Sequence, residues 1–169
     1  MAVDTLQHPW ELEELLCVLR DLAPTRVLEI GAWEGGTLRH WLDSELVVVI
    51  DDEMRRADDW LGWAENVGCD LRLLKGRSQD PEIVAAARGH GPYDFVFVDA
   101  DHRYAAGKAD WENYSPMVAP GGVIAFHDIR RYEHGDLDRL WDEIKVGRRT
   151  LEIHDRTGDA WGGIGLVWM

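Results

Sequence analysis

Acidic side chains stand at the ends of four short apolar runs in the sequence, and histidines lie close to two of them. The residues concerned are Glu29, Asp51, Asp99 with Asp101 and His102, and Asp128 with His127. If the runs are strands of one parallel sheet, these side chains meet at the edge where open α/β sheets bind ligands. Crowded carboxylates repel one another unless a cation or polar ligand shares the site. The pattern therefore favours a functional site over a set of separate helix caps.

A glycine-rich turn, Gly31-Ala32-Trp33-Glu34-Gly35-Gly36, follows the first of these runs. Glycines allow a backbone to approach a ligand closely. The spacing differs from the G-x-G-x-x-G of dinucleotide-binding proteins, and Glu29 and Glu34 would repel a pyrophosphate. The turn favours a ligand that carries an ammonium or sulfonium group. Taken alone it is weak evidence, since such turns occur in many folds, and Trp33 fits a core position as well as a ligand contact.

Hydrophobic periodicity predicts that strands and helices alternate along the chain. The expected strands are residues 26–30, 46–50, 71–74, 93–98, 123–126, 150–154 and 163–168. The expected helices are residues 10–22, 35–42, 54 to about 68, 81–88, 106–114 and 137–144. Alternating elements indicate βαβ units, and the polar loop 155–162 indicates a closing hairpin. The predicted fold is an α/β domain with one doubly wound, mostly parallel seven-stranded sheet and an antiparallel last strand.

Composition limits the classes of function that the chain can have. Its 169 residues, with 46% hydrophobic and 30% charged side chains, predict one domain over residues 1–169. A net charge of −14 argues against a nucleic-acid partner, because the basic residues cluster only as pairs. The two cysteines have no CxxC spacing and support no cysteine metal site. We expect no membrane partner and a cytoplasmic protein, because there is no signal-like segment and the apolar runs are short.

Residues 27–38, VLEIGAWEGGTL, resemble motif I of class I S-adenosylmethionine-dependent methyltransferases. The segment is most similar to the E-x-G-x-x-x-G-x-[ST] form of catechol O-methyltransferases, and to the form in macrolide-sugar O-methyltransferases and cephalosporin-hydroxylase-like proteins. Further similar segments follow in the family's order, and together they span residues 10–168. They are VID at 49–51, GRSQD at 76–80, FVFVDADH at 95–102, PGGVIAFHD at 120–128 and GIG at 163–165. The resemblance implies a Rossmann-like methyltransferase fold.

The resemblance also implies a set of cofactor-binding residues. S-adenosylmethionine would contact Glu29, Gly31, Trp33, Gly35, Gly36, Thr37, Asp51, Ser78, Gln79 and Asp99. Within this set, Glu29 and the glycine-rich turn would hold the methionine part, with Thr37 near its carboxylate. Asp51 would accept the ribose hydroxyls, and Ser78 with Gln79 would meet the adenine. The implied donor is therefore a methyl sulfonium, in agreement with the acidic turn.

The catalytic residues implied by the resemblance follow the fourth and fifth strands. Asp99 and Asp128 would bind Mg²⁺, a hard cation that prefers oxygen ligands. His102 would be the general base, three residues after the metal aspartate, and Asp101 is the competing base. The sequence departs from the macrolide group at His127, where that group has an acid. The expected function is metal-assisted O-methylation of a small-molecule hydroxyl.

Two other functions remain open at this stage. A nucleotide-dependent oxidoreductase could use a similar sheet, although the glycine spacing and the acidic turn argue against it. A binding module that keeps the cofactor but has lost catalysis is the second alternative, and the presence of Asp99 and His102 weighs against it. The chain lacks the N-terminal helices that cover the substrate in catechol enzymes. The site is therefore expected either to be open or to be closed by a partner subunit of a homo-oligomer.

Overall fold

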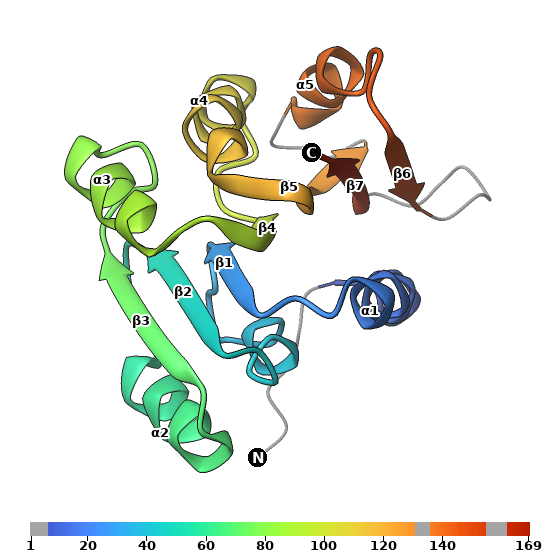
Figure 1. Cartoon of the computed structure of the whole chain (residues 1–169). Coiled ribbons are helices and arrows are strands. Elements are labelled where there is room, and N and C mark those ends of the chain that lie inside the picture. Colours follow the sequence, from blue (N-terminus) through green and yellow to red (C-terminus); the bar gives the residue numbers. More distant parts are fainter. Residues whose placement is uncertain (1–6, 131–135, 155–161) are drawn as a thin grey trace.

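A seven-stranded sheet forms the centre of the computed structural model, which describes residues 7–130, 136–154 and 162–169. The strand order is β3-β2-β1-β4-β5-β7-β6 (Figure 1). The strands are β1 (Arg26–Ile30), β2 (Leu46–Asp51), β3 (Asp70–Lys75), β4 (Tyr93–Val98), β5 (Val118–Arg130), β6 (Thr150–Ile153) and β7 (Gly162–Trp168). Strands β1 to β5 pair in parallel, whereas β7 is antiparallel to both of its neighbours. The predicted fold class is therefore confirmed. Most of the predicted hairpin loop, residues 155–161, lies outside the described residues.

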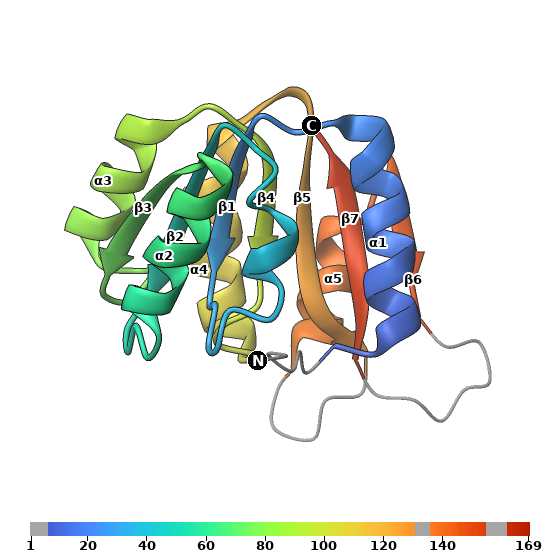
Figure 2. The ribbon, with the colours of Figure 1, turned by 90° about the horizontal axis from the view of Figure 1, so that it is seen from below.

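Within the residues that the structure describes, five α-helices cover the two faces of the sheet. They are α1 (Pro9–Leu22), α2 (Ala57–Val67), α3 (Pro81–His90), α4 (Tyr104–Tyr114) and α5 (Leu137–Ile144). Helices α1 and α2 lie on one face and α3, α4 and α5 on the other (Figures 1 and 2). In the described part of the chain, none of these helices has the length and apolar character needed to cross a membrane.

Alternating side chains of the central strands build two separate hydrophobic cores. In β2, Val47 and Val49 belong to the core under α1 and α2, whereas Val48 and Ile50 belong to the core on the opposite face. All four side chains are buried. This explains why β2 is a continuous apolar run, because successive side chains point to opposite faces and both faces are covered.

The connections place one crevice at the carboxyl ends of the strands. β1 lies between β2 and β4, so the chain moves outward in one direction through β2 and β3 and in the other from β4. The reversal of strand order beside β1 is a topological switch point, where ligands of open α/β sheets bind. The acids predicted to meet at one edge of the sheet lie around this point.

One predicted helix was wrong, and one predicted strand is longer than expected. The expected helix over residues 35–42 is only a 3₁₀-helix, η1 (Leu38–His40), inside a run of turns. Gly35 and Trp33 have positive φ angles of 83° and 48°, which are incompatible with an α-helix. The strand expected at residues 123–126 is the longer β5. Its pairing with β7 is irregular between His127 and Arg130, and Asp128 has φ 56°. The sequence at this irregularity resembles a turn, so the strand was expected to end there. In the structure the strand continues beyond it.

Candidate functional site

A cavity of about 310 Å³ opens at the carboxyl ends of β1, β2, β3 and β4. Six of the residues predicted to contact a cofactor line it: Gly31, Trp33, Asp51, Ser78, Gln79 and Asp99. The other four, Glu29, Gly35, Gly36 and Thr37, are buried and do not line it. The structure thus brings the segments at the ends of four neighbouring strands together around one hollow.

The glycine-rich turn is held close to the end of β4. The Gly31 N–H donates to the Ile50 carbonyl, and the Asp99 N–H donates to the Ile30 carbonyl, both at 2.8 Å. Gly31 has φ 84°, and a Cβ atom on it would lie 2.2 Å from the Asp99 carbonyl oxygen. Only glycine fits this approach, so Gly31 determines how near the turn comes to Asp99.

Asp51 connects the glycine-rich turn to the loop after β2. Its Oδ2 accepts hydrogen bonds from the N–H groups of Ala32 at 3.1 Å and Trp33 at 3.2 Å. Its Oδ1 accepts hydrogen bonds from the N–H groups of Glu53 at 2.9 Å and Met54 at 2.7 Å. A carboxylate offers about four lone-pair positions. If Asp51 also accepts hydrogen bonds from ribose hydroxyls, as predicted, it must do so with oxygens that already accept hydrogen bonds from two loops.

Glu29 lies beneath the turn rather than in the cavity. Its side chain is completely buried, and its Oε1 accepts a short hydrogen bond from the Thr37 hydroxyl. Burial raises the pKa of Glu29 to about 8, although the bond from Thr37 opposes this. Glu29 is therefore protonated at neutral pH, and it fixes Thr37 in the turn.

A third acid, Asp110 of α4, supports the segment after β3. Sequence patterns did not identify it, although an acid at an inward-facing helix position was the available signal. The Gln79 side-chain amide donates to Asp110 at 2.8 Å and to the Ser78 hydroxyl at 2.6 Å. The Tyr114 hydroxyl donates to the Ser78 carbonyl at 2.6 Å. Burial raises the pKa of Asp110 to about 6. Together α4 and this network fix the segment predicted to meet adenine.

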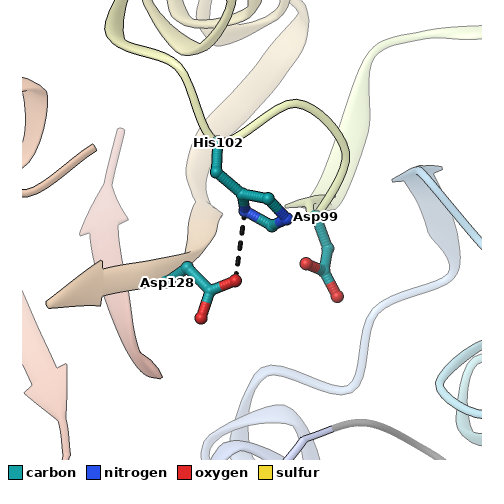
Figure 3. Close-up of side chains that lie close together, drawn as sticks. All are labelled: Asp99, His102 and Asp128. Carbon is teal, nitrogen blue, oxygen red and sulfur yellow. Dashed lines mark ion pairs between the residues drawn. The ribbon is translucent and has the colours of Figure 1, made fainter. Parts of the chain in front are cut away.

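Asp99, His102 and Asp128 converge at the end of the cavity that contains Asp99. Figure 3 shows the imidazole of His102 projecting between the two carboxylates. His102 Nδ1 lies 3.1 Å from Asp128 Oδ2, and one potential ligand atom from each residue lies within 4.8 Å of the others. The Gln7 side-chain amide donates to Asp99 Oδ2 at 2.6 Å. The residues predicted as metal ligands and base therefore form one cluster.

His127 is buried behind this cluster, next to Glu11 of α1. Its Nδ1 lies 3.3 Å from Asp99 Oδ1 and 3.3 Å from Asp128 Oδ2. Its Nε2 lies 3.8 Å from Glu11 Oε2. Burial alone would lower the pKa of His127, but the surrounding carboxylates raise it well above its ordinary value. Glu11 was missed because a glutamate in the first turn of a helix is a common exposed residue, and only the fold buries it.

Asp101, the competing candidate for the base, is paired with a neighbouring arginine. Arg103 donates from its backbone N–H at 3.0 Å and from Nε at 2.9 Å to Asp101 Oδ1. The hydrogen bonds from Arg103 hold the pKa of Asp101 below its ordinary value. A carboxylate stabilised in its charged form is a weaker proton acceptor, which favours His102 as the base.

The cluster fits a divalent cation on the chemistry of its donors. Asp99 and Asp128 provide carboxylate oxygens, and the buried Asp128 Oδ1 makes no hydrogen bond within the described ranges. Burial alone would raise the pKa of Asp99, but the imidazoles of His127 and His102 hold it below its ordinary value. Asp99 is therefore ionised and able to ligate. The third potential ligand beside these two acids is a histidine nitrogen rather than an oxygen. Such a ligand is unusual for Mg²⁺, which ordinarily takes oxygen ligands.

Residues 28–129 match the model of a family described as a methyltransferase domain. The match covers more than half of the chain, so the protein belongs to this methyltransferase family. The class expected from the sequence, an S-adenosylmethionine-dependent methyltransferase, is confirmed.

Solved structures with this fold include several O-methyltransferases. An enzyme from Bacillus cereus in complex with SAH has 19% identity and a TM-score of 0.74, covering 99% of this chain and 84% of that one. TomG from Streptomyces achromogenes in complex with SAM has 20% identity and a TM-score of 0.69, covering 97% and 81%. MycE of mycinamycin biosynthesis, in complex with Mg, SAH and mycinamycin VI, has 24% identity and a TM-score of 0.68, covering 97% and 50%. Likeness at these identities establishes the Rossmann-like methyltransferase fold.

A relative found by sequence is much longer than this chain. An uncharacterized protein of Sinorhizobium fredii, y4gI, is 39% identical over 61 residues. The match covers 36% of this chain and only 7% of that protein. It therefore gives no information on substrate or partners.

Proposed function

We propose that the protein transfers the methyl group of S-adenosylmethionine to a hydroxyl oxygen of a small molecule, in a single domain over residues 1–169. One observation carries this proposal: Asp99 both lines the cavity and belongs to the cluster with His102 and Asp128. A methyl donor in the cavity would therefore lie beside a base and a candidate cation site. The structures of O-methyltransferases with SAH or SAM bound support the choice of cofactor.

His102 is the proposed base because of its position relative to Asp128. The contact of Nδ1 with Asp128 Oδ2 at 3.1 Å favours the tautomer with the proton on Nδ1. Nε2 then accepts the hydroxyl proton, and the acceptor oxygen bonds to the methyl carbon as the carbon–sulfur electron pair remains on sulfur. Asp99 and Asp128 would hold a divalent cation, which lowers the pKa of a coordinated hydroxyl. Asp51 and the turn that it supports would orient the cofactor.

The proposal is tested by ligand binding followed by product detection. S-adenosylhomocysteine should raise the melting temperature of the protein, and nicotinamide dinucleotides should not. The purified protein is then incubated with S-adenosylmethionine that carries a labelled methyl group and a panel of sugars, phenols and aliphatic alcohols. Label recovered on oxygen supports O-methylation. Stabilisation by a nicotinamide dinucleotide alone would favour an oxidoreductase, and tight cofactor binding without transfer to any acceptor would favour a binding module.

A further inference from the structure

We propose that His127 supplies the third protein ligand of the cation site, so that Asp99, Asp128 and His127 Nδ1 bind a first-row transition cation in preference to Mg²⁺. The cations meant are Mn²⁺, Fe²⁺, Co²⁺ and Zn²⁺. This inference rests on the proposed function only because that function places a cation at Asp99 and Asp128.

The position of His127 Nδ1 suits a shared cation. It lies 3.3 Å from an oxygen of Asp99 and 3.3 Å from an oxygen of Asp128. Ligand atoms about 2.0–2.2 Å from one cation are separated by roughly 3–3.5 Å in tetrahedral or octahedral sites. The separations of His127 Nδ1 from both carboxylate oxygens are therefore those of atoms that bind one cation.

Glu11 lies where a metal-binding histidine usually has an outer hydrogen-bond acceptor. Histidines that bind metals almost always donate their other ring N–H to a carboxylate, a carbonyl or water. The Glu11 side chain is completely buried, and its Oε1 accepts a 3.1 Å hydrogen bond from the Gly163 N–H. Its Oε2 faces His127 Nε2 at 3.8 Å. When a cation replaces the Nδ1 proton, the proton that stays on Nε2 is directed at Glu11, and the Nδ1 lone pair is available to a cation lying between His127, Asp99 and Asp128.

Unsatisfied polar atoms point to a missing group at this place. Within the residues that the structure describes, Glu11 Oε2, Asp128 Oδ1 and both ring nitrogens of His127 are buried without a hydrogen bond of good geometry. Buried polar groups are normally satisfied, and an exception calls for an explanation such as an ion. A cation between Nδ1 and the two aspartates gives the ring a partner on one side and aligns it with Glu11 on the other.

The donor set decides which cations are preferred. Imidazole nitrogen suits zinc, iron and other first-row transition cations, whereas Mg²⁺ takes oxygen donors and retains water. A neutral imidazole in place of an acid also removes one negative charge from the site. Mg²⁺ should lose more affinity from this replacement than a cation that bonds well to nitrogen.

His102 is the residue with which His127 must be distinguished, because its Nδ1 also approaches Asp128 Oδ2, at 3.1 Å. In this proposal His102 remains the base and is not a ligand. Mn²⁺ provides the distinguishing probe, because electron spin-echo modulation detects a ¹⁴N nucleus bonded to it. The measurements use chelator-treated protein without cofactor or acceptor, so they do not depend on activity.

The experiment compares the wild type with His127→Glu, His102→Ala and Glu11→Gln, each checked for a cooperative thermal transition. The wild type and His102→Ala should show the directly bonded ¹⁴N signal, and His127→Glu should lack it. Calorimetric titration should show that the wild type binds Co²⁺ more tightly than Mg²⁺. The ratio of these two affinities should fall by about tenfold or more in His127→Glu. Glu11→Gln should weaken Co²⁺ binding by about 10–100-fold.

Three results would overturn the inference. These are a ¹⁴N signal that disappears in His102→Ala but persists in His127→Glu, an unchanged Co²⁺ to Mg²⁺ ratio in His127→Glu, and a wild type that binds none of these cations. Binding of S-adenosylhomocysteine is measured separately on the same preparations. If that binding persists while the metal results fail, only the inference about His127 is wrong. If S-adenosylhomocysteine does not bind, the proposed function itself fails.

Discussion

His102 Nδ1 lies 3.1 Å from Asp128 Oδ2, although the two residues come from different parts of the sheet edge. His102 belongs to the segment between β4 and α4, and Asp128 lies in the irregular stretch of β5 where its φ is 56°. The Asp128 carboxylate orients the imidazole, so that Nδ1 faces Asp128 and Nε2 points away from it. A neutral histidine oriented in this way can accept a proton at its other ring nitrogen.

Replacing the proposed base should separate catalysis from binding. His102→Ala should lower the rate of methyl transfer by about 10²–10⁴-fold, because positioned bases contribute on that scale. Its affinity for S-adenosylhomocysteine, measured by calorimetry, should not change. His40→Ala, an exposed histidine in η1, is the control and should retain full rate. Near-normal turnover of His102→Ala would mean that this histidine only caps the helix that follows it.

Asp51 should matter for both affinity and stability. Asp51→Ala removes the acceptor of four backbone N–H groups, so it should weaken S-adenosylhomocysteine binding roughly tenfold or more and lower the melting temperature. Asp51→Asn retains one acceptor oxygen and should lose less of each. Asp21→Ala, at an exposed position on α1, serves as the control. Unchanged affinity in Asp51→Ala would remove this residue from the cofactor site.

Gly31 should tolerate no side chain. Gly31→Ala places a Cβ atom 2.2 Å from the Asp99 carbonyl oxygen at a φ of 84°. The backbone strain alone is about 1–2 kcal/mol, and relief of the clash must move the turn away from β4. We expect lower stability in urea and weaker cofactor binding. Gly62→Ala is the matched control, because open space surrounds that helical glycine, and it should gain up to about 1 kcal/mol. Equal stability of the two variants would contradict the close approach.

Glu29 should make stability fall as the pH rises. Its folded pKa is raised to about 8 from 4.5, so between these values the folded state holds a proton that the unfolded chain has released. The free energy of unfolding then decreases by about 1.4 kcal/mol per pH unit from this group. Glu29→Gln lacks this dependence. Urea unfolding of both proteins from about pH 5 to about pH 8 should show the variant gaining on the wild type, and parallel curves would exclude a protonated Glu29.

Removal of divalent cations should stop methyl transfer and spare cofactor binding. We expect this because Asp99 and Asp128 lie close together at the end of the cavity, where they could bind a cation. After thorough chelation, the rate should fall to background, and a divalent cation should restore it. S-adenosylhomocysteine binding is measured in parallel as the control. Activity that survives chelation would mean that these acids orient the acceptor without a metal.

Much of the fold could be predicted because the strands of a doubly wound sheet are covered on both faces. Each such strand therefore appears in the sequence as a continuous apolar run. β2 shows this plainly, since each of its apolar side chains enters one of two cores. The glycine-rich turn was harder to predict. Residues 35–42 have helical spacing, but Trp33 and Gly35 have positive φ angles. A Cβ atom on Gly35 would also collide with the Trp60 ring, and a local sequence pattern cannot report such a tertiary contact.

The candidate site could be predicted where motifs mark strand ends, and not where helices from elsewhere complete it. Asp99, His102 and Asp128 come together as expected, because the first two follow β4 and the third lies near the carboxyl end of the neighbouring β5. Glu11 and Asp110 were not foreseen, because each enters the site from a helix whose rotation and depth depend on tertiary packing. Both are acids on helices, and acidic side chains are usually exposed.

The contact between Glu11 and Gly163 has a consequence for when the protein becomes competent during its synthesis. These residues are 152 positions apart, one on the first helix and the other on the last strand. A nascent chain can form the glycine-rich turn and β1 to β5 well before β7 has left the ribosome. It cannot fix Glu11 against His127 until then. Metal binding at the proposed site would therefore have to wait until β7 has been synthesised and has joined the sheet.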